Sequence, residues 1–416
     1  MVPAASLPTN ATAKQHPIHR WFNFIAGFSP EFVYQCCQSV SLGPESVLLD
    51  PFAGCATAPV VACQLGITAV GFEPHPVFLR IARAKLPSPH WIADLPRIEA
   101  ALLEGFAHPA DPCTLPPAPA AFLGKLFPDS VLRVLLGGRR ALDDHRLSDN
   151  DLAFLILSCA LEQCCHSQTD GIYKALTTHK ASALPPDACA ELVARVRADL
   201  LAVGPAYPGI RARMFPDSSE SMHALGDASV SIVVTSPPYL DNFDYAEMTR
   251  MYLYFWGIAN SWQEITEKVR ATLVTNTTTA LAGHRHGQEQ HRDAVPSVLH
   301  PQLDSLVAVL AERRKTKAGK KDYHLLVYPY FAQMTRVLRE CSRVMRPGAP
   351  IHIMVADSAL YGVHVASPQF LARILSEIGF RSTAVAFVRG RGHRWALAKR
   401  AGSPTGLAEF HVCALR

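Results

Sequence analysis

A strand, helix and strand pattern near the N-terminus constrains the fold of this chain more than any other feature. Residues 44–83 read PESVLLDPFAGCATAPVVACQLGITAVGFEPHPVFLRIAR, where SVLLD and TAVGFE flank a helical pattern that ends at Gly66. Short, continuous apolar runs are typical of strands that are buried on both faces of a parallel sheet. Two such strands joined by a helix form a βαβ unit, which predicts a doubly wound α/β sheet.

Further strands are predicted later in the chain. The runs SVSIVVTSPPY, APIHIMVAD, FRSTAVAFV and AEFHVCALR have strand character, and the last two are expected to form an antiparallel pair. A helix is predicted over YFAQMTRVLRECSRVMRPG. Between the two groups of strands, a Pro/Ala linker and several helical patterns predict a helical insertion.

These patterns divide the chain into six segments. We predict a flexible tail at 1–15, the cofactor-binding half of the core at 16–94 and the helical insertion at 95–210. The catalytic part of the core, a polar and basic loop and the C-terminal part of the core follow, at 211–275, 276–322 and 323–416.

Composition excludes several classes of protein. Of the 416 residues, 49% are hydrophobic and 18% charged, which favours a compact globular protein. The chain has no apolar run of membrane length and no signal-peptide pattern, so a cytoplasmic location is expected. The eleven cysteines form no CxxC pair, so we expect reduced, buried thiols and no metal site. A net charge of +5 permits a polyanionic partner.

The turn DPFAGCAT after the first strand is suited to contact a ligand. Small residues between a strand and a helix let the backbone approach a ligand closely, so Asp50 and Gly54 are expected to face the polar end of a cofactor. Glu73 ends the next strand 19 residues later, at about the spacing that places a carboxylate on a ribose hydroxyl pair. Since GxGxxG and GK[ST] are absent, an adenosine-containing cofactor is favoured over a nucleoside triphosphate.

The stretch TSPPYLDNFDY follows another strand. Two prolines fix the backbone and remove two N–H groups, which leaves nearby carbonyl groups free to accept hydrogen bonds from an amino group. Ser236 adds an oxygen and Tyr239 adds a flat apolar ring, so the loop can hold a planar ring that carries an NH₂ group. The alternative is a rigid strand exit with a packed tyrosine.

DPFAGCAT, Glu73 and TSPPY together resemble the motifs of S-adenosylmethionine-dependent DNA amino-methyltransferases. The segment HRWFNFIAGFSPEFV is similar to the part of these enzymes that closes over the cofactor, and it contains Phe28. The resemblance implies a Rossmann-like, seven-stranded methyltransferase sheet with a helical insertion, S-adenosylmethionine as cofactor and double-stranded DNA as substrate. A serine before the prolines is more typical of cytosine-N4 enzymes, whereas adenine-N6 enzymes usually carry Asp or Asn there.

The resemblance also implies roles for individual residues. Asp50, Phe52 and Gly54 would line the methionine end of the cofactor, Glu73 would bind the ribose, and Asp217 would meet the adenine. The target-base pocket would be formed by Ser236, Pro237, Pro238 and Tyr239. The sequence departs from the family pattern twice, because Ala56 replaces a glycine in the cofactor turn and Ser231 stands where Asp is frequent.

These residue types predict a mechanism of direct transfer. The lone pair of an exocyclic amine is delocalised into its ring, and hydrogen-bond acceptors at Ser236 Oγ and the Pro237 carbonyl would localise it toward the methyl group. The base must leave the duplex, at a cost of a few kcal/mol that stacking on Tyr239, with Phe243 or Tyr245, would offset.

Other residues were weighed against ordinary structural roles. Cys113 follows a proline, as does the nucleophile of ring-carbon cytosine methylases, but it lies in a linker without a cofactor motif. The histidines of GHRHGQEQH lack a cysteine partner and are interpreted as solvated. Phosphate contacts are expected from the basic run ERRKTKAGKK and from RGRGHRW, which contain Arg313, Arg314, Lys315, Arg389, Arg391, Arg394 and Trp395.

Three alternative functions stay open from the sequence. They are adenine-N6 methylation of DNA, guanine-N2 methylation of RNA, and nucleic-acid binding without catalysis, which Ala56 keeps open. A restriction or defence partner is compatible with the DNA-modifying reading, and the sequence defines no oligomeric state.

Overall fold

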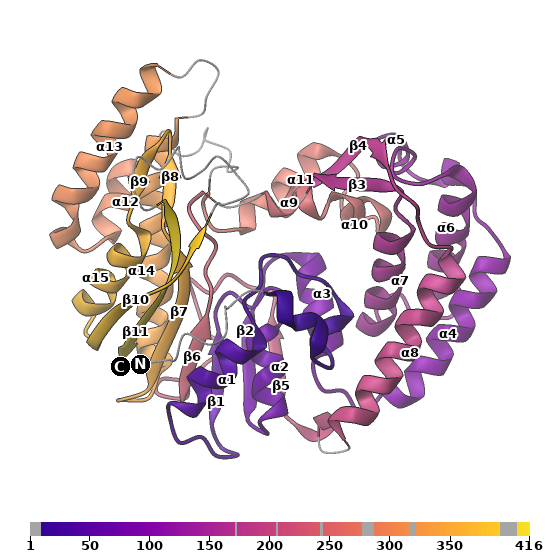
Figure 1. Cartoon of the computed structure of the whole chain (residues 1–416), viewed down its shortest axis with the longest axis horizontal. Helices are drawn as coiled ribbons and strands as arrows, with labels where there is room; N and C mark the ends of the chain where they lie inside the picture. Colours follow the sequence, from indigo (N-terminus) through magenta and orange to yellow (C-terminus); the bar gives the residue numbers. More distant parts are fainter. Residues whose placement is uncertain are drawn as a thin grey trace.

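A seven-stranded, mostly parallel sheet forms the centre of the protein, seen in a computed structural model (Figure 1). The structure describes residues 10–170, 173–204, 207–241, 244–276, 287–316, 322–391 and 406–416. The strand order across the sheet is β10-β11-β7-β6-β1-β2-β5. The strands are β1 (Val47–Asp50), β2 (Thr68–Phe72), β5 (Ala212–Phe215), β6 (Ile232–Thr235), β7 (Pro350–Ala356), β10 (Arg381–Arg391) and β11 (Leu407–Leu415).

The parallel part of the sheet begins at the predicted βαβ unit. β1 pairs in parallel with β2 on one side and with β6 on the other, and β5 and β7 extend the sheet in parallel beyond them. β11 runs antiparallel to both β7 and β10. The predicted mixed α/β architecture and the predicted antiparallel pair are therefore confirmed.

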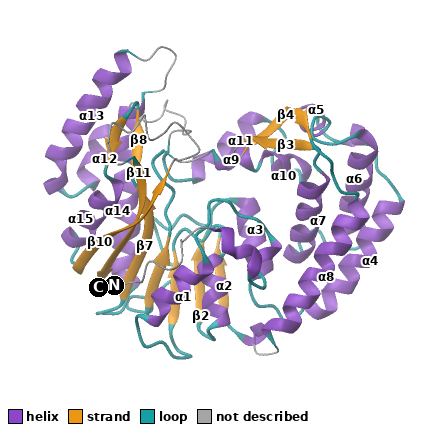
Figure 2. Ribbon diagram, viewed as in Figure 1, coloured by secondary structure: helices purple, strands orange, loops and turns teal. Residues whose placement is uncertain are grey.

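Helices cover both faces of the sheet, as Figure 2 shows in ribbon form. Side chains alternate across a strand, so Leu48 joins the hydrophobic cluster beneath α1 and α2, whereas Leu49 joins the cluster beneath α14 and α15. The helices of these layers are α1 (Pro30–Gln38), α2 (Thr57–Gln64), α3 (Pro76–Lys85), α14 (Val327–Val344) and α15 (Ser367–Glu377).

A largely helical region lies between β2 and β5 in the sequence and forms a separate lobe beside the sheet (Figure 1). Helix α4 packs on α6 and α8, and α7 joins this group to α3. A short antiparallel hairpin, β3 (Ser167–Asp170) with β4 (Tyr173–His179), interrupts the helices and was not predicted. The helices are α4 (Trp91–Ala107), α5 (Pro117–Leu123), α6 (Asp129–Asp144), α7 (Asp151–Cys164) and α8 (Pro185–Val203).

Three short helices follow β6 in the chain. They are α9 (Tyr245–Met248), α10 (Arg250–Phe255) and α11 (Trp262–Lys268). Asp244 caps α9, because its carboxylate accepts a hydrogen bond from the Glu247 N–H at 3.1 Å and forms an ion pair with Arg270. The Asp244 N–H donates to the Tyr173 hydroxyl at 2.9 Å, which connects this segment to the β3–β4 hairpin.

The segment 276–322, predicted as a loop, differs from the prediction where the structure describes it. Residues 287–316 form α12 (Gln288–Ala294) and α13 (His300–Lys315). The reason is visible in α13, where Leu303 and Leu310 are seven residues apart on one helix face and both are fully buried. A small hairpin, β8 (Ser358–Leu360) with β9 (Val363–Val365), lies beside α13.

The described part of the predicted tail, residues 10–15, contacts the core of the protein. Residues Asn10–Gln15 form a 3₁₀ helix, and Thr12 Oγ1 donates to the Glu31 carboxylate at 2.8 Å. Farther along, Asp199 of α8 is fully buried and accepts hydrogen bonds from the Ile18 N–H at 2.8 Å and Trp21 Nε1 at 2.9 Å. The N-terminal segment is thereby anchored to the helical region.

Among the described residues, no single helix meets the length and hydropathy expected of a membrane span. Only the bent pair Gln288–Ala294 and Ser297–Lys315 does so jointly, by length and composition alone.

Candidate active site

A pocket that is partly open to solvent lies where β1, β2 and β6 end. The carboxyl ends of parallel strands meet at one edge of the sheet, and ligands of doubly wound folds bind there. The pocket is lined from six parts of the chain. They are the N-terminal segment, the cofactor turn, the end of β2 with the start of α3, the loop after β5, the loop after β6 with the start of α9, and residues 272–276. The two motifs that the sequence analysis placed on separate strands therefore share one cavity.

The cofactor turn after β1 depends on a glycine at the pocket wall. Gly54 has a φ of +52°, and a Cβ atom at this position would lie 2.8 Å from Cε1 of Phe24. A side chain at this position is therefore disfavoured by the backbone conformation and would require the Phe24 ring to move. Ala56 also adopts a left-handed conformation, with φ of +65°, at the N-cap of α2. The position where a family glycine is replaced by alanine is thus one that glycine favours.

Asp50 supports this turn from below and is not on the pocket wall. Its Oδ1 accepts hydrogen bonds from Thr235 Oγ1 at 2.6 Å and from the Phe52 N–H at 3.0 Å. Its Oδ2 has no hydrogen-bond partner among the described residues. Complete burial raises the pKa of Asp50 to about 7, and the two hydrogen bonds lower it only in part. Asp50 thus connects the ends of β1 and β6.

Glu73 lies on the pocket wall at the end of β2, and only 8% of the residue is exposed. Its Oε1 accepts a hydrogen bond from the His75 N–H at 2.8 Å. Burial raises the pKa of Glu73 to about 7, while hydrogen bonds from the His75 and Gly54 backbone act in the opposite direction. A carboxylate in this position can accept hydrogen bonds from hydroxyl groups of a ligand.

Aromatic rings form much of the remaining wall. Phe28 and Phe52 line the pocket as expected, together with Phe24 and Phe78, which the sequence analysis did not name. The rings of Phe24 and Phe78 meet edge to face at 4.9 Å. Phe24 belongs to the segment HRWFNFIAGFSPEFV, whereas Phe78 belongs to α3 and reaches the pocket only through the fold.

The loop after β6 divides its residues between two sides. Ser236 and Pro238 line the large pocket, whereas Pro237 is buried and lines a smaller cavity with residues of α14 and β7. The Pro238 carbonyl accepts a hydrogen bond from the Tyr330 hydroxyl at 3.0 Å. This bond attaches the loop to α14, while Ser236 lines the pocket.

Tyr239 lies in a cluster of charged side chains beside the pocket. The guanidinium of Arg391 lies 4.9 Å from the centre of the Tyr239 ring, a cation–π contact. Arg391 is also 4.0 Å from the Asp241 carboxylate, which accepts a hydrogen bond from Ser358 Oγ at 3.0 Å. Burial raises the pKa of Tyr239 above its usual range. The expected phosphate contact Arg391 is therefore held among groups of the protein.

Of the two other residues predicted to contact the target base, the structure describes only Tyr245. Tyr245, the first residue of α9, lines the same pocket as Gly54, and its ring meets Phe78 edge to face at 6.1 Å. Phe243 lies outside the described residues.

Asp217, the residue expected to meet adenine, is exposed and does not line the pocket. The next two residues, Ser218 and Ser219, do so instead. The loop after β5 therefore reaches the pocket, although through hydroxyl groups and not through the expected carboxylate.

The expected phosphate contacts at the end of α13 are only partly free of protein partners. Arg314 pairs with Asp322 at 2.8 Å, Lys315 pairs with the exposed Glu312 at 2.6 Å, and Arg313 is exposed. Arg389 forms a two-point ion pair with Glu409, and Arg394 and Trp395 lie outside the described residues.

Cys113, the candidate nucleophile weighed above, is exposed in a short 3₁₀ helix and is not among the pocket residues. A hydrogen bond to the Asp111 carboxylate raises its thiol pKa, which opposes thiolate formation. Of the histidines considered as ligands, His284 and His286 lie outside the described residues.

The fold and pocket define a mixed α/β protein with a ligand site at the carboxyl ends of its central strands. Comparison with known proteins is more specific. The chain is 23% identical over 428 aligned positions to the type II methyltransferase M.BsoBI of Geobacillus stearothermophilus, covering 91% of this chain and 81% of that protein. It is 22% identical over 416 positions to the type II methyltransferases M.AvaI of Nostoc sp. and of Anabaena variabilis, covering 88% of this chain and 80% of each. No family model matches the chain. The resemblance to methyltransferases that the motifs indicated is confirmed by these relatives.

Proposed function

We propose that this protein is an S-adenosylmethionine-dependent DNA methyltransferase that modifies the exocyclic amino group of a base, with cytosine N4 as the preferred target. One observation carries the proposal. Gly54 of the cofactor turn, Glu73 of β2 and Ser236 of the SPPY loop line the same pocket. A methyl donor and an acceptor amine must meet at one point for direct transfer, and this pocket has both sets of residues.

The residues of the pocket fit the cofactor in two ways. Gly54 gives a wall without a side chain, where a Cβ would overlap the Phe24 ring. Glu73 offers a carboxylate to a ribose hydroxyl pair, and Phe28 and Phe52 offer apolar faces nearby. When bound, S-adenosylmethionine would supply an electrophilic methyl group on its sulfonium.

Ser236 would act on the amino group of the base. Its Oγ can accept one amine hydrogen, which draws the nitrogen lone pair out of the ring and toward the methyl group. Pro237 and Pro238 have no N–H group, so the two backbone positions directly after Ser236 cannot donate hydrogen bonds that would compete for the acceptor. Tyr330 holds the loop through the Pro238 carbonyl, which preserves the direction of the serine.

The choice of cytosine rests on the residue before the prolines. A serine at position 236 is neutral and short, and the enzymes that the motif resembles carry it more typically when the target is cytosine N4. Adenine N6 is the alternative target in the same pocket. The base would reach it by leaving the duplex, as is required of enzymes that act on a base.

The test is methyl transfer from labelled S-adenosylmethionine to unmodified double-stranded DNA, with bulk tRNA in a parallel reaction, followed by nucleoside mass spectrometry. We expect N4-methylcytosine in DNA. If N6-methyladenine appeared instead, the target base would be adenine and not cytosine. Label in tRNA alone would refute DNA as the substrate.

Two serine variants at opposite ends of β6 form a matched pair. Ser236→Ala removes the pocket hydroxyl, and we expect transfer to fall about 100-fold with cofactor affinity retained. Ser229→Ala removes a hydroxyl that donates to the Gly226 carbonyl at 2.7 Å, and transfer should be unchanged. Equal activity of the two variants would contradict the role of Ser236.

A further inference from the structure

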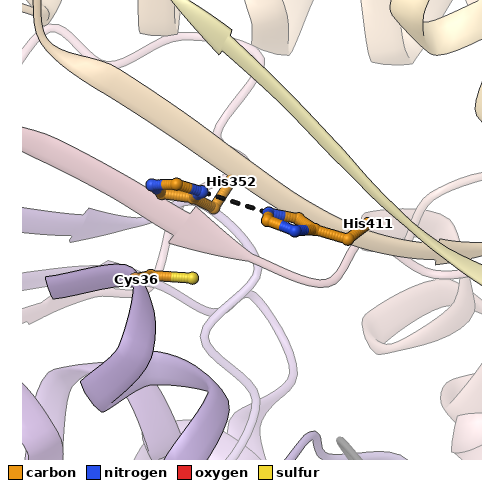
Figure 3. A group of neighbouring side chains, drawn as sticks. All are labelled: Cys36, His352 and His411. Carbon is orange, nitrogen blue, oxygen red and sulfur yellow. Dashed lines mark hydrogen bonds between the residues drawn. The ribbon is translucent and has the colours of Figure 1, made fainter. Parts of the chain in front are cut away.

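A cysteine and two histidines from distant parts of the sequence meet beneath helix α1 (Figure 3). Cys36 comes from α1, His352 from β7 and His411 from β11. Cys36 is fully buried, and each histidine is only 7% exposed. The cluster is absent from the lining of the active-site pocket, so the proposed methyl transfer does not account for it.

The sheet register places the two histidines on one face. His352 pairs with Cys413 and His411 pairs with Met354, so all four side chains point to the same side of the β7–β11 ladder. Figure 3 shows the two rings side by side, with the Cys36 thiol beneath them. Helix α1 covers this side of the ladder and supplies the thiol.

The distances agree with those of a metal centre. His352 Nδ1 and His411 Nε2 are 3.1 Å apart, and the three donor atoms all lie within 4.8 Å of one another. A tetrahedral zinc ion has bonds of about 2.0 Å to nitrogen and 2.3 Å to sulfur, which separates its ligand atoms by about 3.3 to 3.6 Å. Shifts of roughly 1 Å or less therefore bring all three atoms onto one ion.

A second layer of contacts supports a ligand role for His352. Its other ring nitrogen, Nε2, lies 3.5 Å from Ser39 Oγ, and the Ser39 hydroxyl donates to the Cys36 carbonyl at 2.6 Å. Metal-bound histidines commonly donate their second ring N–H to such a group, which fixes the tautomer and frees the other nitrogen for the metal. Ser39 thus connects two of the three ligands.

We propose that Cys36, His352 and His411 bind a zinc ion. One thiolate with two imidazoles is a donor set that zinc accepts in tetrahedral sites, and zinc needs no redox partner. Binding replaces the thiol proton of Cys36 by the metal and releases that proton to solvent. Cys413 lies two residues after His411 on the same strand face and is a candidate for the fourth position.

The ion would have a mechanical role in the N-terminal region. Helix α1 begins at Pro30, two residues after Phe28 in the pocket wall, and the Cys36 bond would fix this helix to β7 and β11. A metal-free alternative exists, because the histidine pair can also join the two strands through its own hydrogen bond. The two readings differ in whether the purified protein holds a metal.

The first measurement is metal content by inductively coupled plasma mass spectrometry on the full chain, after loading with zinc and exhaustive dialysis. We expect about one zinc per chain. Loading with cobalt in place of zinc should give the ligand-field bands of a tetrahedral site and a thiolate-to-cobalt charge-transfer band. No retained zinc, or a cobalt spectrum without the charge-transfer band, would overturn the proposal.

Variants then assign the ligands. Cys36→Ala and His411→Gln should each lower zinc affinity at least 10-fold. Cys63→Ala removes a buried thiol from α2 in the same hydrophobic cluster and should retain the metal. Zinc bound equally by the Cys36 and Cys63 variants would refute the site. The cobalt spectrum of the unaltered protein decides the question even where a ligand variant fails to fold.

Discussion

Replacing Gly54 by alanine tests the pocket most directly, because a matched glycine exists at the other end of α2. Gly54 and Gly66 both have left-handed backbone conformations, with φ of +52° and +76°. An added Cβ at Gly54 would lie 2.8 Å from Phe24 Cε1, whereas a Cβ at Gly66 would have no neighbour within 4 Å. The two substitutions share the backbone strain and differ in the contact.

The magnitudes follow from these two effects. Left-handed alanine costs about 1 to 2 kcal/mol, and the smaller entropy of the unfolded alanine chain returns about 0.4 to 1 kcal/mol. Gly66→Ala should therefore lower the free energy of unfolding by about 1 kcal/mol. Gly54→Ala adds overpacking against Phe24 of about 1 to 3 kcal/mol. Since Phe24 is itself a wall of the pocket, cofactor affinity should fall about 10- to 100-fold in this variant alone.

Urea denaturation measures the stability of both variants, and isothermal titration calorimetry with S-adenosylmethionine measures their dissociation constants. Equal dissociation constants in the two variants would refute the placement of the cofactor against Gly54. Gly66→Ala is the control: it should lose the stability expected from its left-handed backbone and bind the cofactor as well as the unaltered protein. This separates the effect of backbone strain from that of the contact with Phe24.

Four further outcomes are expected. Cofactor affinity should weaken as the pH falls below about 7, because burial raises the pKa of Glu73 to about 7 and the protonated acid loses acceptor capacity. Calorimetry as a function of pH should show this weakening, and Glu73→Gln should abolish it. The cofactor-free protein should gain stability from Asp50 as the pH falls from about 7 toward 4, since the folded protein binds that proton more tightly than the unfolded chain; a flatter pH profile of urea denaturation is expected for Asp50→Asn. Asp199→Asn should lower the free energy of unfolding by about 3 kcal/mol, because it places an amide against buried hydrogen-bond donors. Asp187→Asn, at the exposed start of the same helix, should lower it by less than about 1 kcal/mol; urea denaturation measures both. Ser236→Ala should lower the rate of single-turnover methyl transfer and leave the calorimetric dissociation constant of the cofactor unchanged, and a weaker constant would reassign that serine to cofactor binding.

The sequence predicted an element correctly where the property that forms the element, such as a run of apolar side chains, is local in the sequence. Apolar runs predicted β1, β2, β6 and β7, because a strand buried on both faces needs apolar side chains throughout. β5 was not predicted, since its ARMF stretch alternates with charge and lies at the sheet edge. Helix α13 was missed although it carries five Leu and Val residues, because the polar and basic stretches on both sides of it made the whole segment look like a loop.

The candidate site was partly predictable for the same reason. Gly54, Glu73 and Ser236 follow strands directly, so topology alone brings them to one edge. Asp217 was displaced from the wall because a loop of several residues after β5 can present any of its side chains, and here it presents Ser218 and Ser219. The Cys36, His352 and His411 cluster has no spacing signal, since its ligands belong to a helix and two strands joined only by the fold.

The buried carboxylate of Asp199 has a consequence for communication within the molecule. It lies on α8 of the helical region and holds Ile18 and Trp21, a few residues before Phe24 and Phe28 in the wall of the pocket. A partner that displaced α8 and a ligand that contacted Phe24 and Phe28 would therefore act on the same segment of the chain. Any coupling between these two binding events would be reciprocal, so each would change the affinity for the other by the same factor. The hydrogen bonds to Asp199 thus form a direct structural link between the helical region and the segment that leads into the pocket wall.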